Sequence, residues 1–166
     1  MVTKGTRIIG IDPGYGRCGW GMIDVAGNRL TYVAHGVWEP CKDISLSARL
    51  MILYDGLRSV LERWAPAEAG VEMLFFSKNT KTATDVGQAR GVLLLGCAQA
   101  GLEVASYKPT EIKQAVTGHG QADKRQVQRM VKALLGLREI PKPDDAADAL
   151  AVAVCHAQSR VWRRLG

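Results

Sequence analysis

The N-terminal part of the chain consists of short apolar segments with the pattern of β-strands. Residues 7–12 (RIIGID) form an apolar run that ends in an acid, as expected of a short buried strand. Segments 14–24 and 29–39 are predicted to be two further strands, joined by a turn at residues 26–28. Together these three segments predict an antiparallel meander.

The rest of the chain alternates between helical and extended patterns. Apolar residues recur with a helical period from Leu46 to Trp64, and Pro66 ends this helix. The remaining predictions, in chain order, are a strand at 69–74, a helix at 82–100, a strand at 102–107, two helices after Pro109 with a loop at 117–122 between them, and a helix from about 144 towards 160. This order indicates an α/β domain with a mixed sheet. Because no repeat or linker divides the chain, we expect residues 1–166 to form a single domain.

Length and composition narrow the class of protein. The 166 residues are 47% hydrophobic and 23% charged, which is typical of a folded domain that needs no disulfide or metal to fold. No apolar run approaches the roughly 20 residues that cross a bilayer, and the N-terminus lacks the apolar core of a signal peptide. The four cysteines form no CxxC pair. We therefore expect a cytoplasmic protein with reduced thiols and no membrane partner.

Positive charge is concentrated in the C-terminal part of the chain. The formal net charge is +6, and residues 104–166 carry eleven Lys and Arg against six Asp and Glu. A basic region on a small domain is typical of a protein that binds nucleic acid, although a well-solvated surface has the same composition.

Two acids follow or interrupt apolar strands. Asp12 is followed by a glycine-rich segment at 14–21, which allows a backbone or a phosphate to approach the carboxylate closely. This pattern fits an Asp on a catalytic metal, a cradle for nucleotide phosphates, or an Asp that only caps a turn. Glu72 is a single acid inside an apolar strand, where it is either functional or part of a structural salt bridge.

A third acidic motif begins the last predicted helix. Residues three or four apart share a helix face, so Asp148 lies beside both Asp144 and Asp145. Like charges in this arrangement repel each other unless a cation lies between them, although acids in a first turn also complement the helix dipole.

Taken together, the three acidic motifs favour a metal-dependent nuclease. Oxygen ligands suit Mg²⁺ or Mn²⁺, whereas zinc would require histidine or cysteine, and the three histidines show no HxH or HExxH spacing. Two hard cations roughly 4 Å apart, bridged by a carboxylate, are a common device for phosphodiester hydrolysis. A basic surface beside an acidic pocket suits such an enzyme.

Four segments of the chain stand out together. They are GIDPGYGRCGWG at 10–21, VEMLFFSKNTKTATDVGQARG at 71–91, YKPTEIKQAVTGHGQADKRQVQRMV at 107–131 and PDDAADALAVAVCHA at 143–157. In their order and spacing these segments resemble the RuvC-type Holliday junction resolvases of the ribonuclease H-like superfamily. The resemblance implies a ribonuclease H-like fold, with a mixed five-stranded sheet of a three-stranded antiparallel meander plus two parallel strands, flanked by helices. It also implies a crossover junction endodeoxyribonuclease of homologous recombination and DNA repair. Such an enzyme makes paired symmetric nicks in strands of like polarity and leaves 5′-phosphate and 3′-hydroxyl ends.

The resemblance further implies a catalytic and metal-binding tetrad. Its members are Asp12, Glu72, Asp145 and Asp148, with two Mg²⁺ per subunit and Mn²⁺ as the alternative metal. Asp12 is expected to bridge the two ions, Glu72 and Asp148 to hold one each, and Asp145 to complete the coordination. Asp144 is an additional acid beside the pair, and the sequence leaves its participation open.

By the same resemblance, further residues are expected to contact DNA. Phe75 matches an aromatic residue that stacks on bases at the junction centre, with core packing as the alternative, and one of Phe75 and Phe76 should be exposed and the other buried. Lys113 and Lys124 match lysines that contact phosphates near the scissile bond. Arg125 and Arg129, on the basic face of the following helix, are also expected to contact DNA, and for each of these cations a solvated surface charge is the alternative. The helix that begins near Lys124 is amphipathic, and its apolar side is expected to comprise Val127, Met130, Val131 and Leu134.

The expected partners are four-way junction DNA, a second copy of the chain and, by family resemblance, the RuvA–RuvB branch-migration complex. Gly87 and Gly91 lie four residues apart in the helix at 82–100, where they allow another helix to pack closely. The apolar run from Val92 to Leu95 suits such a contact or, alternatively, burial against the sheet. In the family the corresponding helix forms the dimer contact. A homodimer also matches the two-fold symmetry of a four-way junction.

Three alternative functions compete with this interpretation. The sugar kinase, actin and Hsp70 superfamily has a similar phosphate loop, but its members need two such domains and 166 residues are too few. Another ribonuclease H-like nuclease, acting on RNA or linear duplexes, would have the same active site. A non-catalytic module that binds DNA structures would have no use for four clustered acids.

Overall fold

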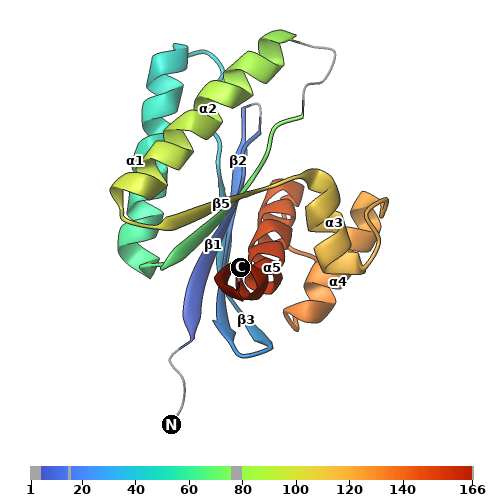
Figure 1. Cartoon of the computed structure of the whole chain (residues 1–166). Helices are drawn as coiled ribbons and strands as arrows, with labels where there is room; N and C mark the ends of the chain where they lie inside the picture. Colours follow the sequence, from blue (N-terminus) through green and yellow to red (C-terminus); the bar gives the residue numbers. More distant parts are fainter. Residues whose placement is uncertain (1–4, 15, 76–79, 166) are drawn as a thin grey trace.

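The computed structural model describes residues 5–14, 16–75 and 80–165. The order of the elements follows the predicted pattern (Figure 1). They are β1 (Thr6–Asp12), β2 (Cys18–Ala26), β3 (Arg29–Trp38), α1 (Leu46–Trp64), β4 (Glu68–Glu72), α2 (Thr80–Gln99), β5 (Glu103–Tyr107), α3 (Pro109–Thr117), α4 (Lys124–Leu134) and α5 (Asp144–Leu165).

The five strands form one mixed sheet in the order β3-β2-β1-β4-β5. Strands β1, β2 and β3 pair antiparallel, whereas β4 pairs parallel to both β1 and β5. The expected meander plus two parallel strands is therefore confirmed. The parallel register places Ile11 beside Val71. Asp12 and Glu72, the next residue on each strand, consequently lie at the same edge of the sheet.

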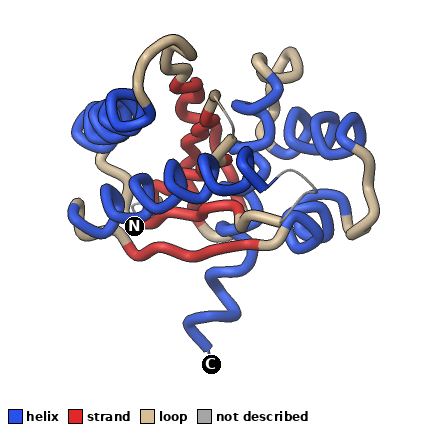
Figure 2. The backbone as a smooth tube through the Cα atoms, turned by 90° about the horizontal axis from the view of Figure 1, so that it is seen from above, coloured by secondary structure: helices blue, strands red, loops and turns tan. Residues whose placement is uncertain are grey.

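Helices cover both faces of the sheet (Figures 1 and 2). Ile9 and Ile11 of β1 belong to a core shared with α1 and α2, whereas Ile8 belongs to a core shared with α3, α4 and α5. This alternation follows from the two-residue period of a strand. Asp12 has the same parity as Ile8, so its side chain points to the face covered by α5.

Glycines allow α5 to lie directly on the sheet. A Cβ atom at Gly10 would overlap the backbone of Ala149 and Ala153, and one at Gly19 would overlap the backbone of Asp145. Gly10 and Gly19 therefore allow a helix backbone to approach the sheet closely. From the sequence, either a backbone or a phosphate was expected to approach at such glycines. The result is a fixed position of α5 over the carboxyl end of β1.

A buried polar network holds the middle of α5 against β4. His156 Nε2 lies 2.8 Å from Glu68 Oε2, and its Nδ1 lies 2.8 Å from the hydroxyl of Tyr107. Arg160 Nε donates to Glu68 Oε2 at 2.9 Å. Burial alone raises the pKa of Glu68, but the hydrogen bonds from Arg160 and His156 outweigh it and hold that pKa below its usual value. The carboxylate thus stays ionised and joins the helix to the strand.

All four cysteines are free, and only Cys41 is exposed. Within the described ranges, no helix is long and apolar enough to cross a membrane.

Candidate active site

Four carboxylates from three distant segments meet at one end of the sheet. Asp12 ends β1, Glu72 ends β4, and Asp145 and Asp148 lie in the first two turns of α5. Asp12 and Glu72 share a side-chain hydrogen bond, and the charges of Asp12 and Asp145 both act on Asp148. The structure therefore brings together the four acids that the sequence singled out.

The electrostatic state of this cluster favours a cation. Burial, the hydrogen bond with Glu72 and the charges of Glu72 and Asp145 raise the pKa of Asp12 to about 9. Burial, together with the charges of Asp12 and Asp145, raises the pKa of Asp148 to about 6 despite the opposing effect of Lys124. The neighbouring carboxylates thus disfavour the ionisation of Asp12 and Asp148, and a bound positive charge would relieve this repulsion.

Two basic side chains flank the carboxylates. Lys124 Nζ lies 3.1 Å from Asp148 Oδ2 and 3.4 Å from Asp144 Oδ2. On the other side of the cluster, Arg17 Nη1 lies 3.4 Å from Asp145 Oδ2, and Arg17 Nη2 lies 2.7 Å from Glu39 Oε1. The contact of Lys124 with Asp148 and that of Arg17 with Asp145 use carboxylate oxygens that would otherwise be available to a metal ion.

The positions of the acids on α5 bear on the role of Asp144. Its side chain is 62% exposed and contacts Lys124, whereas that of Asp148 is 29% exposed. Asp145 contributes to the raised pKa of Asp12. Asp145 and Asp148 therefore face the carboxylates of the sheet, and Asp144 lies at the rim.

The donor set fits a hard divalent cation, although the side chains are not yet arranged as its ligands. In the part of the chain that the structure describes, no three His, Cys, Asp or Glu side chains converge into a metal-binding group. All the donors in the cluster are carboxylate oxygens on a strand end or a helix, which suits Mg²⁺ or Mn²⁺ and not zinc. The residues that could hold such ions are Asp12, Glu72, Asp145 and Asp148. Asp148 must first be released from Lys124, and Asp145 from Arg17.

A pocket beside the carboxylates carries two of the predicted DNA contacts. It has a volume of about 200 Å³ and is lined by Glu72, Pro109, Ile112, Lys113, Lys124, Val127, Asp148 and Ala151. The two lysines come from α3 and α4, and the two acids come from β4 and α5. The pocket therefore places basic and acidic side chains side by side, as required to bind a phosphodiester and act on it.

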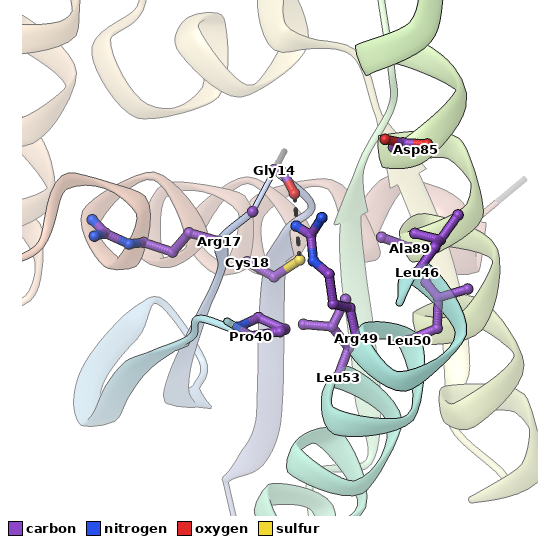
Figure 3. A pocket seen from close by; sticks show the side chains of 11 residues that line it. Gly14, Arg17, Cys18, Pro40, Leu46, Arg49, Leu50, Leu53, Asp85 and Ala89 are labelled. Carbon is purple, nitrogen blue, oxygen red and sulfur yellow. Dashed lines mark hydrogen bonds between the residues drawn. The ribbon is translucent and has the colours of Figure 1, made fainter. Parts of the chain in front are cut away.

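A second, smaller pocket lies behind the glycine-rich segment. Figure 3 shows Arg49 extending from α1 towards Gly14 and Cys18, whereas Arg17 points away from this pocket. The Cys18 thiol donates to the Gly14 carbonyl oxygen at 3.8 Å, and burial raises the pKa of this thiol to about 11. The space is only about 20 Å³, room for about one water molecule. This space is too small for a phosphate group.

Comparison with known proteins assigns the family. Residues 8–156 match the family model described as "Crossover junction endodeoxyribonuclease RuvC". The chain belongs to the RuvC family. It is 52% identical over 155 residues to the RuvC of Heliobacterium modesticaldum, covering 93% of this chain and 96% of that protein. It is 53% identical over 160 residues to the RuvC of Desulfitobacterium hafniense strain DCB-2, covering 96% and 97%.

Solved structures agree with this membership. The T. thermophilus RuvC in complex with Holliday junction substrate matches with a TM-score of 0.89 at 34% identity, over 95% of this chain and 96% of that one. The yeast mitochondrial Holliday junction resolvase Ydc2 matches with a TM-score of 0.67 at 13% identity, a likeness of fold alone. RuvC proteins are crossover junction endodeoxyribonucleases, so the expected enzyme class and ribonuclease H-like fold are confirmed.

Other residues of this RuvC-family chain, predicted to contact DNA, lie on exposed surfaces. Phe75 is 64% exposed, so the alternative of core packing is excluded, and Phe76 lies outside the described residues. Arg125 and Arg129 are exposed on α4. Of the predicted apolar side of α4, Val127 and Val131 are buried, whereas Met130 is 37% exposed, and Gln128 is buried as well.

Two arginines near the carboxylates were missed by the sequence analysis. Arg17 follows Asp12 by only five residues, and this proximity was the available signal, but its contact with Asp145 depends on the position of α5. Arg90 donates a hydrogen bond to the backbone carbonyl of Glu72 at 3.0 Å. A bond to a backbone oxygen leaves no side-chain pattern in the sequence.

The two glycines of α2 have different surroundings in the RuvC-family fold. A Cβ at Gly87 would lie 3.6 Å from Leu74 Cδ1, within the same protomer. A Cβ at Gly91 would have no atom within 4 Å. Leu95, one turn further along the helix, is 56% exposed. Gly91 and Leu95 therefore lie on the outer face of α2, which is open to a partner.

Proposed function

We propose that this protein is a metal-dependent Holliday junction resolvase that acts through Asp12, Glu72, Asp145 and Asp148. The observation that supports the proposal is the gathering of these carboxylates beside the Lys113–Lys124 pocket in a RuvC-family fold. The T. thermophilus RuvC with 0.89 TM-score similarity was solved with a Holliday junction substrate, which indicates the substrate class.

In this proposal the four carboxylates hold two Mg²⁺ ions, with Mn²⁺ as the alternative. When bound, such cations supply positive charge to the phosphodiester and make water a better nucleophile. Asp12 is central to the set because its side chain contacts Glu72 and its charge acts on Asp148. Asp12 would serve both ions, Glu72 and Asp148 would each contribute to holding one, and Asp145 would complete the set of ligands.

The lysines position the DNA strand for hydrolysis. Lys124 now pairs with Asp148, and a phosphate in the pocket would offer its ammonium group a new anionic partner. The oxygen of the attacking water forms a bond to phosphorus and gives up a proton to the surrounding water, and the bond from phosphorus to the 3′ oxygen breaks. The leaving oxygen takes up a proton from the surrounding water and becomes a 3′-hydroxyl, and the other product carries the 5′-phosphate.

The first experiment compares nicking of a labelled four-way junction, a linear duplex and an RNA–DNA hybrid in Mg²⁺, Mn²⁺ or EDTA. We expect paired, symmetric nicks in two strands of like polarity, in the junction alone, and no cutting in EDTA. Equal cutting of the linear duplex or the RNA–DNA hybrid would mean that the protein is another ribonuclease H-like nuclease and that the junction is not its specific substrate. Tight binding without cutting in either metal would make the protein a non-catalytic DNA-binding module.

Removal of Lys124 is expected to weaken a phosphate contact. In Lys124→Ala, the slope of log Kd for junction binding against log salt concentration should fall by about one unit, because one phosphate contact is lost. Binding is measured in EDTA, so that cutting does not interfere. Arg58→Ala on α1, across the sheet from α4, is the control and should keep the wild-type slope. An unchanged slope in Lys124→Ala would remove this residue from the DNA interface.

The protein is further proposed to act as a homodimer through the outer face of α2. Gly91 allows close approach of a second helix, and exposed Leu95 offers it an apolar contact. Light scattering should give twice the chain mass of 18.0 kDa for the wild type and the single mass for Leu95→Glu. Met51→Glu, which changes an exposed apolar residue of α1, is the control and should remain dimeric. A wild-type mass near 18.0 kDa would contradict the dimer.

The remaining sequence expectations stay predictions. They are that residues 1–166 form one functional domain, that the protein is cytoplasmic, and that it works with a RuvA–RuvB branch-migration complex. The expected contact with RuvA–RuvB rests on family resemblance alone, and no motif of the chain identifies it.

A further inference from the structure

Arg90 connects α2 to the strand end that carries Glu72. Its guanidinium is half-buried; Nε donates to the Glu72 carbonyl oxygen at 3.0 Å and Nη2 donates to Ser106 Oγ at 2.7 Å. Ser106 lies on β5, the neighbour of β4. One side chain thus joins α2, β4 and β5 at the edge of the sheet where the carboxylates meet.

The carbonyl that Arg90 holds lies where β4 leaves the sheet. The pairing of β4 with β1 ends at Val71, and its pairing with β5 ends at Glu72 and Tyr107. Beyond this point Met73 N still donates to the Tyr107 carbonyl oxygen at 2.8 Å. The hydrogen bond from Arg90 therefore holds the β4 backbone at Glu72, one residue beyond the last pair between β4 and β1. A charged donor makes a stronger hydrogen bond than a neutral peptide group.

A second contact ties the same segment to α2. Leu74 lies against Gly87, where a Cβ would be 3.6 Å from Leu74 Cδ1. The chain from Glu72 to Phe75 is therefore fastened to α2 at two successive points, one polar and one apolar. The peptide that carries the Glu72 carbonyl is bonded to the same α-carbon as the Glu72 side chain. Fixing its orientation restricts the direction of the carboxylate and of the chain that leads to Phe75.

We propose that Arg90 is a positioning residue, which holds the Glu72 carbonyl and thereby directs the Glu72 carboxylate towards Asp12 and the exposed Phe75 towards DNA. The inference rests on the proposed function, since it assigns a role within that active site. Arg90 touches neither substrate nor the reacting atoms in this role. Displacement of a catalytic group by about 1 Å costs on the order of 100-fold in rate.

Steady-state cutting of a four-way junction, measured for Arg90→Met, Arg90→Lys and Ser106→Ala, tests the proposal. We expect kcat of Arg90→Met to fall by roughly 10- to 100-fold with KM nearly unchanged, because the phosphate contacts lie on α3 and α4. Arg90→Lys can restore one hydrogen bond and should recover part of kcat. Ser106→Ala keeps the bond to Glu72 and should lose less than Arg90→Met. Arg58→Met, which removes a surface arginine of α1, is the matched control.

A second readout does not depend on cutting. A junction with 2-aminopurine at its centre is bound in EDTA, and its fluorescence reports how Phe75 stacks on the bases. We expect Arg90→Met to change this fluorescence relative to wild type and Arg58→Met to leave it unchanged. Wild-type kcat and fluorescence in Arg90→Met would overturn the proposal, as would an equal loss of binding and cutting in Arg90→Met and Arg90→Lys. Failure of wild type to cut any junction would instead overturn the proposed function.

Discussion

Asp12→Asn is expected to abolish junction cutting, with kcat lower by at least about 10³-fold, while junction binding in EDTA stays near the wild-type value. The substitution removes one carboxylate oxygen from the acid that contacts Glu72 and acts on Asp148. An amide carries no negative charge, so the site loses affinity for divalent cations. Binding persists because the lysines of α3 and α4 are unchanged. Single-turnover cutting and fluorescence anisotropy of the same labelled junction measure the two effects.

A distant surface acid provides the control for this experiment. Asp55 is exposed on α1, away from the carboxylates, and Asp55→Asn removes one negative charge from the surface. This variant should cut at the wild-type rate. Wild-type cutting by Asp12→Asn would refute the role assigned to Asp12. Loss of junction binding together with cutting would indicate that Asp12 acts on the fold or on DNA contacts, and not on the chemical step.

Gly10→Ala is expected to lower the free energy of unfolding by about 3 kcal/mol or more and to eliminate cutting. The new Cβ would overlap the backbone of Ala149 and Ala153, so α5 must move away from β1. Backbone atoms cannot give way by changing rotamer, which makes this overlap costly. The displacement would also carry Asp145 and Asp148 away from Asp12. Urea denaturation followed by circular dichroism measures the first effect, and junction cutting measures the second.

Gly120→Ala is the matched control. A Cβ at Gly120 would meet its neighbours at 3.5 Å and 3.6 Å, ordinary contact distances, and its backbone has no positive φ. The unfolding free energy of this variant should change by less than about 0.5 kcal/mol. Equal stabilities of Gly10→Ala and Gly120→Ala would mean that α5 does not depend on close approach to β1. The account of how Gly10 allows α5 to pack on the sheet would then be wrong.

Local patterns predicted the elements of the fold well. The helical period from 46 to 64 coincides with α1 (Leu46–Trp64), which starts after the N-cap Ser45, whose side chain accepts a hydrogen bond from Ala48 N. Such signals depend on neighbouring residues along the chain, and they are complete in the sequence. The same holds for the type of chemistry. Several acids without matching histidines or cysteines indicate a hard cation wherever the fold brings them together.

Contacts between elements could not be predicted in the same way. The pattern of α4 does not separate the buried Val131 from Met130, which is 37% exposed, and it gives no sign that Gln128 is buried. Likewise, Gly87 and Gly91 look equivalent in sequence. Leu74 lies against Gly87, whereas a Cβ at Gly91 would have no atom within 4 Å. Periodicity describes the face of one element, whereas its partner depends on how separate elements pack.

The sequence by itself determined the order of strands and helices, the four acids and the class of metal that suits them. Only the tertiary structure decided that Asp145 faces Asp12 while Asp144 lies at the rim beside Lys124. It also placed Arg17 on Asp145 and Arg90 on the Glu72 carbonyl. The reason is that these relations depend on how closely α5 approaches β1 and β2 and where α2 lies over β4. Those distances arise from packing between segments far apart in the chain, and no local pattern encodes them.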